Sequence, residues 1–172
     1  MIAHKVIWGR NEVMTMAVTA KDIIKRIKEE NIQMVDFKMV DINGQFRHVT
    51  IPARNFTEAT MTEGIGFDAS NYGYAVVEKS DMVFIPDPET AQVDPFCDVP
   101  TLSMTGNAMI IDYPHNRPLD QYPRNIVLAA EKYMRDTGVA DTMLILPEFE
   151  FYLFDSVTWD VRPDAIGMTI YA

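Results

Sequence analysis

The sequence predicts an α+β fold, on three observations taken along the chain. An amphipathic helical pattern begins near Thr19, a hairpin pattern covers residues 33–51, and short apolar runs follow it. A second helical pattern then leads into the apolar run of residues 143–155. With 172 residues, the chain is long enough for one compact domain, or for one domain and part of another.

Composition is that of a soluble globular protein and narrows the range of partners. Hydrophobic residues make up 48% of the chain and charged residues 23%. The formal net charge of −10 argues against nucleic acid or an anionic membrane surface as a partner. The single cysteine, Cys97, suits a cytoplasmic location, and we expect it to be a small buried core residue. No apolar run approaches the ~20 residues of a membrane span.

The first structured element is expected to be a helix that begins at Thr19. Residues 1–16 are interpreted as an extension or a misassigned start, because Met14 and Met16 could each begin the protein. Thr19 is a good helix cap, and Asp22 stands three places on, as in a capping box. Three isoleucines follow at helical spacing, so this helix should pack one face against a core.

A β-hairpin is expected at residues 33–51. Apolar residues alternate with Asp36 and Lys38 in its first strand, and the segment D-I-N-G at residues 41–44 has the chemistry of a tight turn. His48 falls in the second strand, where cross-strand packing is favoured over catalysis.

A glycine-rich loop at residues 64–73 is the first candidate binding segment. It combines three glycines with Asp68, a serine and an asparagine, a composition typical of shaped loops that carry binding groups. A plain surface loop has the same composition, so composition alone does not decide. Residues 52–63 before it should be irregular or a short helix. Further short strands are expected at residues 74–77, 82–85, 102–104 and 108–113.

A second helix is expected to begin near Pro123 and to end at Gly138. Proline is favoured in the first turn of a helix and glycine just past its end. Its expected apolar face consists of Ile126, Val127, Ala130, Tyr133 and Met134. After residue 155 we expect a turn at residues 159–163 and a strand that starts at Met168.

The apolar run of residues 143–155 is expected to be a buried strand, and it contains two glutamates. Side chains two residues apart in a strand share a face, so Glu148, Glu150 and Tyr152 would lie together. The two carboxylates would be roughly 6.5 Å apart at the backbone. Two like charges that close favour a bound divalent cation such as Mg²⁺ or Mn²⁺. The alternative is an edge strand with both glutamates in water, and spacing alone does not separate the two.

Taken in order, these segments closely resemble the amino-terminal part of type I glutamine synthetase. The resemblance runs from about Lys21 to Asp155 at nearly constant spacing, and its specificity comes from the whole series. The matching segments are V-D-F-K-M-V-D-I-N-G, H-V-T-I-P, G-F-D-A-S, E-K-S-D-M, P-D-P-E-T-A-Q-V-D-P-F, Y-P-R-N-I, G-V-A-D-T and P-E-F-E-F.

The resemblance implies a β-grasp domain at residues 17–117 and the incomplete beginning of a catalytic α/β domain at residues 118–172. It implies an ATP-dependent ligation of ammonia to glutamate through γ-glutamyl phosphate, with ATP as a substrate. Two Mg²⁺ or Mn²⁺ ions per complete site would neutralise the phosphate oxygens. It also implies a cytoplasmic homo-oligomer with active sites between subunits. No separate cofactor-binding residue is assigned.

Three site residues follow from the resemblance. Glu148 and Glu150 match the family's two metal-binding glutamates, the first for the metal nearer ATP and the second for the metal nearer glutamate. Asp68 matches the aspartate of the family's F-D-G-S-S-I segment, which helps to bind and deprotonate ammonium. In the assembled enzyme this loop reaches the neighbouring subunit's site, so Asp68 should act in trans.

The chain also departs from the family pattern. The segment from Asp68 to Asp81 is one residue shorter, which leaves room for a relative that ligates another amine. The family's remaining metal ligands, with its ATP and glutamate contacts, would lie beyond Ala172, so we expect the 172-residue chain to be catalytically incomplete. The alternative is a non-catalytic module that co-assembles with a full-length enzyme. The substituted positions are Ala69, Tyr122, Leu146, Phe149 and Tyr152.

Overall fold

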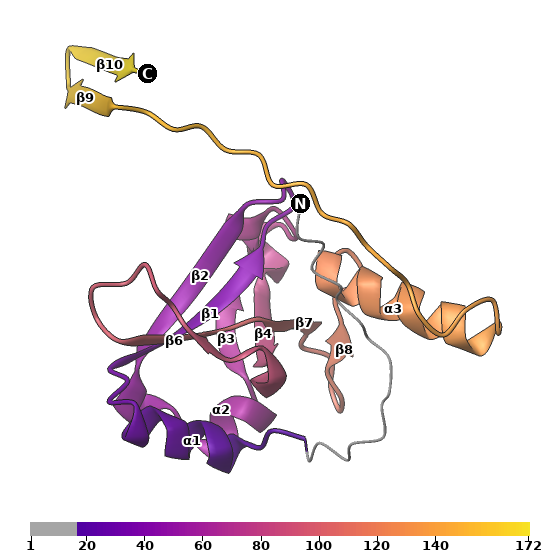
Figure 1. Ribbon diagram of the computed structural model, residues 1–172. Helices are drawn as coiled ribbons and strands as arrows, with labels where there is room; N and C mark the ends of the chain where they lie inside the picture. Colours follow the sequence, from indigo (N-terminus) through magenta and orange to yellow (C-terminus); the bar gives the residue numbers. More distant parts are fainter. Residues whose placement is uncertain (1–16) are drawn as a thin grey trace. The chain divides into compact units, whose positions relative to one another are not determined.

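The computed structural model of the protein describes residues 17–172 (Figure 1). Contacts divide this part of the chain into a larger unit that ends at Asp141 and a smaller unit, residues 142–172. The expected extension at residues 1–16 lies outside the described residues. No helix in the described part of the chain is both long and apolar enough to cross a membrane.

The larger unit begins with helix α1 (Ala20–Glu29), which has the predicted capping box. The Thr19 hydroxyl accepts a hydrogen bond from the Asp22 amide, and the Asp22 carboxylate accepts one from the Thr19 amide at 2.8 Å. Both satisfy amide groups that a helix start leaves without partners. The helix buries Ile23 in the core, which confirms the predicted packing face.

A four-stranded sheet contains the predicted hairpin at its edge (Figure 1). Strands β1 (Met34–Val40) and β2 (Phe46–Pro52) pair antiparallel, with the turn of the D-I-N-G segment between them. Strand β6 (Thr101–Met104) runs parallel to β1, and the short β5 (Gln92–Val93) pairs antiparallel with β6. The sheet order is therefore β2-β1-β6-β5.

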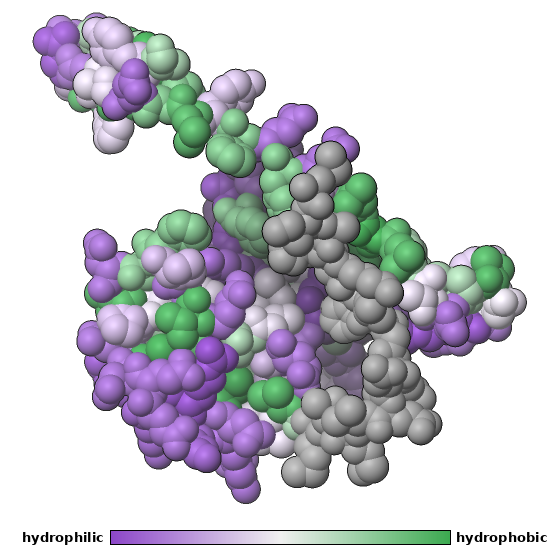
Figure 2. All heavy atoms as spheres, viewed as in Figure 1, coloured by the Kyte–Doolittle hydropathy of each residue, from purple (hydrophilic) through white to green (hydrophobic). Residues whose placement is uncertain are grey.

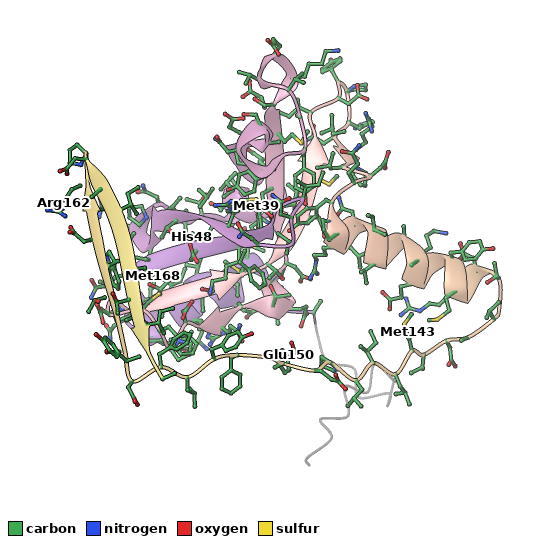
Figure 3. The ribbon with its side chains drawn as sticks, turned by 90° about the horizontal axis from the view of Figure 1, so that it is seen from above. Met39, His48, Met143, Glu150, Arg162 and Met168 are labelled. Atoms are coloured by element: carbon green, nitrogen blue, oxygen red, sulfur yellow. The ribbon has the colours of Figure 1, made fainter. Side chains whose placement is uncertain are left out.

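The two faces of this sheet differ in chemistry, as the alternation of residues in β1 predicts. Phe37 and Met39 are buried in the core. On the opposite face the buried carboxylate of Asp36 accepts from Thr50, and its Oδ1 lies 2.7 Å from Nδ1 of His48. Figure 3 shows Met39 and His48 on this hairpin. His48 thus makes a cross-strand contact, as expected.

The second sheet of the larger unit is antiparallel throughout, in the order β3-β4-β7-β8. Phe84 of this sheet meets Phe37 of the first edge to face, with ring centroids 6.2 Å apart, so both sheets share one core. Its strands are β3 (Ile65–Asp68), β4 (Asp81–Pro86), β7 (Gly106–Ile110) and β8 (Arg117–Pro118). The remaining short elements are α2 (Glu58–Thr62) and the 3₁₀ turns Ala53–Asn55, Ala69–Tyr72, Val77–Lys79 and Pro88–Thr90.

Two expectations for this unit are wrong. Residues 74–77 do not form a strand, because no neighbouring strand pairs with them; the Tyr74 side chain is instead buried, and its hydroxyl donates to the Val40 carbonyl at 2.8 Å. Cys97 is exposed, because it lies in the proline-flanked loop between β5 and β6 rather than in an element with a covered face.

Helix α3 (Pro123–Asp136) begins at the predicted proline. The buried side chain of Asn125 donates to the carbonyls of Ala108 and Leu119 at 2.7 and 3.0 Å, which fixes the start of the helix to β7. The predicted apolar face of this helix is largely exposed. Val127 is 64% exposed and Tyr133 is 70% exposed, because no described element of the unit covers that side of the helix.

The smaller unit contains one antiparallel hairpin of strands β9 (Ser156–Arg162) and β10 (Ala165–Tyr171). The turn lies at residues 163–164, so strand β9 occupies most of the span where a turn was expected, and β10 begins three residues before Met168. Every residue of both strands is exposed.

Candidate functional site

Asp68 is the last residue of β3, at the point where the strand passes into a 3₁₀ turn. It lies directly opposite Asp81, the first residue of β4. Its side chain caps the turn that follows and is exposed to solvent. The glycine-rich loop of the sequence is therefore a strand end and a capped turn, which presents one carboxylate at a defined position.

Hydrogen bonds hold this carboxylate in place. Oδ1 of Asp68 accepts from the amide of Ser70 at 2.9 Å and from its hydroxyl at 2.7 Å. Oδ2 accepts from Nδ2 of Asn71 at 3.3 Å. The Ser70 hydroxyl, followed by the Ser80 hydroxyl and the Ser70 amide, lowers the pKa of Asp68 below its usual value. Asp68 is thus an oriented anion, suited to bind a cation.

The turn after Asp68 packs against the β1–β2 hairpin. Gly73 ends the turn with φ of +79°, and a Cβ atom there would lie 2.5 Å from Cγ2 of Ile42. The Ile42 amide also donates to the Tyr72 carbonyl at 3.1 Å. On its other side, the Tyr72 ring meets Phe67 edge to face at 5.2 Å. Glycine is required here both by the left-handed backbone and by this close approach.

A hollow of about 410 Å³ borders the same turn. Two of its walls come from the turn, and the others come from β2. Its one lining cation, Arg47, is bound through Nε to the buried carboxylate of Asp41 at 2.8 Å. The lining residues are Phe46, Arg47, His48, Asn71 and Tyr72.

Glu148 and Glu150 lie in an exposed segment without secondary structure, whereas a buried strand was expected there. Residues 142–155 do not form a strand, and both glutamates are exposed. Figure 3 shows Glu150 on this extended run, and Figure 2 shows apolar side chains along it. The prediction of a buried strand is wrong for this structure because β9 and β10 pair only with each other, which leaves the segment without a sheet partner.

The extended backbone nevertheless places alternate side chains on one side. The rings of Tyr152 and Phe154, two residues apart, stack with centroids 6.1 Å apart and an interplanar angle of 6°. If the backbone alternates in the same way at residues 148–150, Glu148 and Glu150 share a side. Carboxylate oxygens are suitable ligands for Mg²⁺ or Mn²⁺. Within residues 17–172, however, no third carboxylate, histidine or cysteine joins them in a metal-binding group.

Sequence reasoning found Asp68 but not the groups that hold it. Ser70 could have been found, because an aspartate often accepts from the amide two residues on. Ser80 has no such local signal. It comes near Asp68 only because β3 and β4 pair, which places its carbonyl 2.8 Å from the Ala69 amide.

Residues 31–110 match the family described as "Glutamine synthetase, beta-Grasp domain". These residues are therefore similar to the β-grasp domain of glutamine synthetases. Asp68 and the residues that hold it all lie within the matched span. The α+β architecture and the predicted family resemblance are therefore confirmed.

Known proteins from several organisms are similar over most of the chain. A glutamine synthetase of Frankia alni is 41% identical over 149 residues, which are 86% of this chain and 31% of that protein. A protein of Cupriavidus pinatubonensis named 3-hydroxylaminophenol mutase is 38% identical over 147 residues, 85% of this chain and 31% of that protein. The chain spans about a third of the length of these relatives.

Solved structures agree on the fold. The glutamine synthetase of Plasmodium falciparum, determined by cryo-electron microscopy, superposes with a TM-score of 0.63 at 18% identity. The superposition covers 90% of this chain and 30% of the Plasmodium chain. A structure of GmaS without ligand gives a TM-score of 0.60 at 19% identity, over 68% of this chain and 27% of that chain.

Proposed function

We propose that this chain is the amino-terminal portion of an ATP-dependent ligase that joins ammonia to glutamate through γ-glutamyl phosphate. The observation that carries the proposal is the 41% identity to the Frankia alni glutamine synthetase over 86% of the chain. In the complete protein we expect a cytoplasmic homo-oligomer. Because the chain spans about a third of such relatives, we expect residues 1–172 alone to be inactive.

Asp68 would hold the ammonium that supplies the nucleophile. Its carboxylate is exposed and kept ionised by its hydrogen bonds, so it can attract a cation from solution. A close carboxylate can also accept the proton that ammonium must lose before it attacks. The lowered pKa of Asp68 favours the first role, because a weakly basic carboxylate binds a cation well but takes up a proton less readily. We propose that Asp68 acts on a site completed by a neighbouring subunit.

Glu148 and Glu150 would hold the two divalent metals, one each. Metals bound there would supply charge neutralisation for phosphoryl transfer from ATP to glutamate. The contribution of this chain is two carboxylates two residues apart in an extended segment, exposed and free of ion pairs among the described residues. Glu148 would serve the metal nearer ATP, and Glu150 the metal nearer glutamate.

A chimera tests the proposal. Residues 1–172 are joined to the remaining two thirds of the Frankia alni glutamine synthetase, and ATP-dependent glutamine formation is measured. We expect turnover by the chimera and none by residues 1–172 alone. Asp68→Asn and Glu150→Ala should each lower the activity of the chimera by about 100-fold or more. Glu150→Ala should also raise the Mg²⁺ or Mn²⁺ concentration that is needed.

Glu78→Gln is the matched control, because Glu78 is an exposed carboxylate on the turn Val77–Lys79. It should leave the activity of the chimera unchanged. Full activity of the Asp68→Asn chimera would contradict the role of Asp68, and turnover by residues 1–172 alone would contradict the predicted incompleteness.

Two alternatives give different outcomes in the same system. If the nucleophile is an organic amine, the chimera will form a γ-glutamyl amide with methylamine or putrescine more readily than with ammonia. If residues 1–172 are a non-catalytic module, they will co-assemble with the full-length Frankia enzyme and change its activity on mixing.

A further inference from the structure

A hollow of about 600 Å³ lies beside helix α1 and shares no lining residue with the candidate site. Residues of the last turns of the helix line it, as do residues of the 3₁₀ turn Ala53–Asn55. The Ile32 amide donates to the Ile27 carbonyl at 2.9 Å, and the Ala53 amide donates to the Gln33 carbonyl at 2.8 Å. Backbone hydrogen bonds therefore hold both lining segments close to the start of β1.

Much of the surface of this hollow is apolar. Ile32, Ala53 and Phe56 line it and are buried, so part of its surface belongs to the hydrophobic core. Ile24 and Ile27 also line it and are only half-buried. Pockets for small molecules have about 300–1,000 Å³ and are lined mostly by apolar side chains with a few polar groups. The hollow has both the size and the apolar lining of such a pocket.

Two cationic side chains, Lys28 and Arg54, line the same hollow from different elements. Both are exposed, and neither takes part in an ion pair or a side-chain hydrogen bond among the described residues. The described lining contains no carboxylate. Charge complementarity therefore favours an anion as the occupant of the hollow.

The glutamates at the end of α1 are paired with other cations. Oε1 of Glu29 lies 3.8 Å from Nζ of Lys25, and Oε1 of Glu30 lies 2.7 Å from Nε of Arg26. Both pairs join residues four apart, which are neighbours on a helix surface. The Arg26 carbonyl, near the negative end of the helix dipole, accepts from the Glu30 amide at 2.9 Å. The positive charges at the hollow are thus left without a local partner.

We propose that this hollow binds a small carboxylate with an aliphatic chain, whose charge lies between Lys28 and Arg54 and whose chain covers Ile24 and Ile27. Both parts of the ligand are needed. A small inorganic anion would leave the isoleucines exposed, and a neutral hydrocarbon would leave the cations unpaired. The site lies wholly within the larger unit and does not rest on the proposed function.

The test is an NMR titration of residues 1–172 with octanoate, kept below the concentration at which it forms micelles. The methyl signals of Ile24, Ile27 and Ile32 are followed, and we expect them to shift together and to saturate. Acetate keeps the carboxylate without the chain, and 1-octanol keeps the chain without the charge. Each should bind at least about 5-fold more weakly than octanoate.

Charge variants locate the carboxylate. Lys28→Gln and Arg54→Gln should each weaken octanoate binding by about 2- to 5-fold, the size expected for an exposed ion pair. Both side chains are exposed, so the native spectrum should be kept. Reversal of both charges, in Lys28→Glu with Arg54→Glu, should weaken binding by at least about 10-fold. Lys21→Gln is the matched control, because Lys21 is an exposed lysine of the same helix that does not line the hollow.

Isoleucine signals that do not saturate with octanoate would overturn the proposal. Equal binding of acetate or 1-octanol would also overturn it, as would a loss in Lys21→Gln as large as the losses in Lys28→Gln and Arg54→Gln. These readings need neither ATP nor glutamate. An inactive chimera would therefore refute the proposed ligase and leave this site standing, whereas an active chimera without octanoate binding would refute only this site.

Discussion

Both candidate site segments, the turn at Asp68 and the run with Glu148 and Glu150, carry carboxylates. Hydrogen bonds orient the carboxylate in the first segment but not those in the second. Asp68 ends a paired strand and accepts hydrogen bonds from Ser70 and Asn71. Glu148 and Glu150 lie in an extended run without a sheet partner, and none of the described hydrogen bonds or ion pairs involves their side chains. One carboxylate is already oriented by hydrogen bonds, whereas the other two are exposed and accept none of the described hydrogen bonds.

The difference follows from where each segment finds its partners. The Asp68 loop is held by β4 and by the β1–β2 hairpin, all within the larger unit. Strand pairing of the glutamate segment needs a sheet that residues 142–172 do not supply. An extended run becomes a strand only when neighbouring backbone groups accept and donate its hydrogen bonds. Organisation of the site thus depends on pairing and not on the local sequence alone.

The largest expected difference between the two units is in how much a core substitution lowers the free energy of unfolding. Phe37 is fully buried against Phe84, whereas Phe151 is 76% exposed. Phe37→Ala should lower the free energy of unfolding by about 3–5 kcal/mol, since it removes buried apolar surface and leaves a cavity. Phe151→Ala should change it by less than about 0.5 kcal/mol. Urea denaturation of residues 1–172 measures both, and similar losses for the two would erase the distinction between the units.

Substituting alanine for two glycines should change the free energy of unfolding by a smaller amount. Gly73 has positive φ and touches Ile42, whereas Gly167 in β10 has neither a positive φ nor a neighbour within 4 Å of an added Cβ. Gly73→Ala should lower the free energy of unfolding by about 1–3 kcal/mol. Gly167→Ala should be neutral within about 0.5 kcal/mol. A Gly73→Ala protein as stable as the native one would show that the turn at Asp68 is not held by this contact.

Much of the larger unit could be predicted from sequence because its signals are local. The capping box at Thr19, the D-I-N-G turn and Pro123 each act within a few residues, and each appears where predicted. The Asp68 loop was found for the same reason. Its composition is typical of loops with a defined conformation. The role of Asp68 itself, however, was predicted only from the family resemblance.

The remaining features depend on partners that a local pattern does not specify. The apolar run at residues 143–155 has the composition of a buried strand, yet burial needs another layer to cover it. The apolar face of α3 is exposed for the same reason. Ser80 was missed because its place beside Asp68 depends on the register between β3 and β4.

The smallest expected effect concerns acid stability and compares two aspartates in turns. The Gln45 amide, then the Arg47 side chain and the Asn43 amide, lower the pKa of Asp41 in the folded protein, against the opposing effect of burial. The unfolded chain therefore binds a proton first as the pH falls through about 4. The stability from Asp41 is complete above that range and is lost as the pH falls toward the folded pKa.

Asp41→Asn should reduce the stability that is lost at acid pH. The variant lacks the carboxylate whose pKa differs between the folded and the unfolded protein. Urea midpoints measured between about pH 3 and pH 6 give the slope for the native chain and the variant. Asp164→Asn is the control, since Asp164 is exposed in the β9–β10 turn. The comparison would be contradicted if the pH dependence of stability were unchanged in Asp41→Asn but smaller in Asp164→Asn. In that case the carboxylate responsible for the acid loss would lie in the smaller unit.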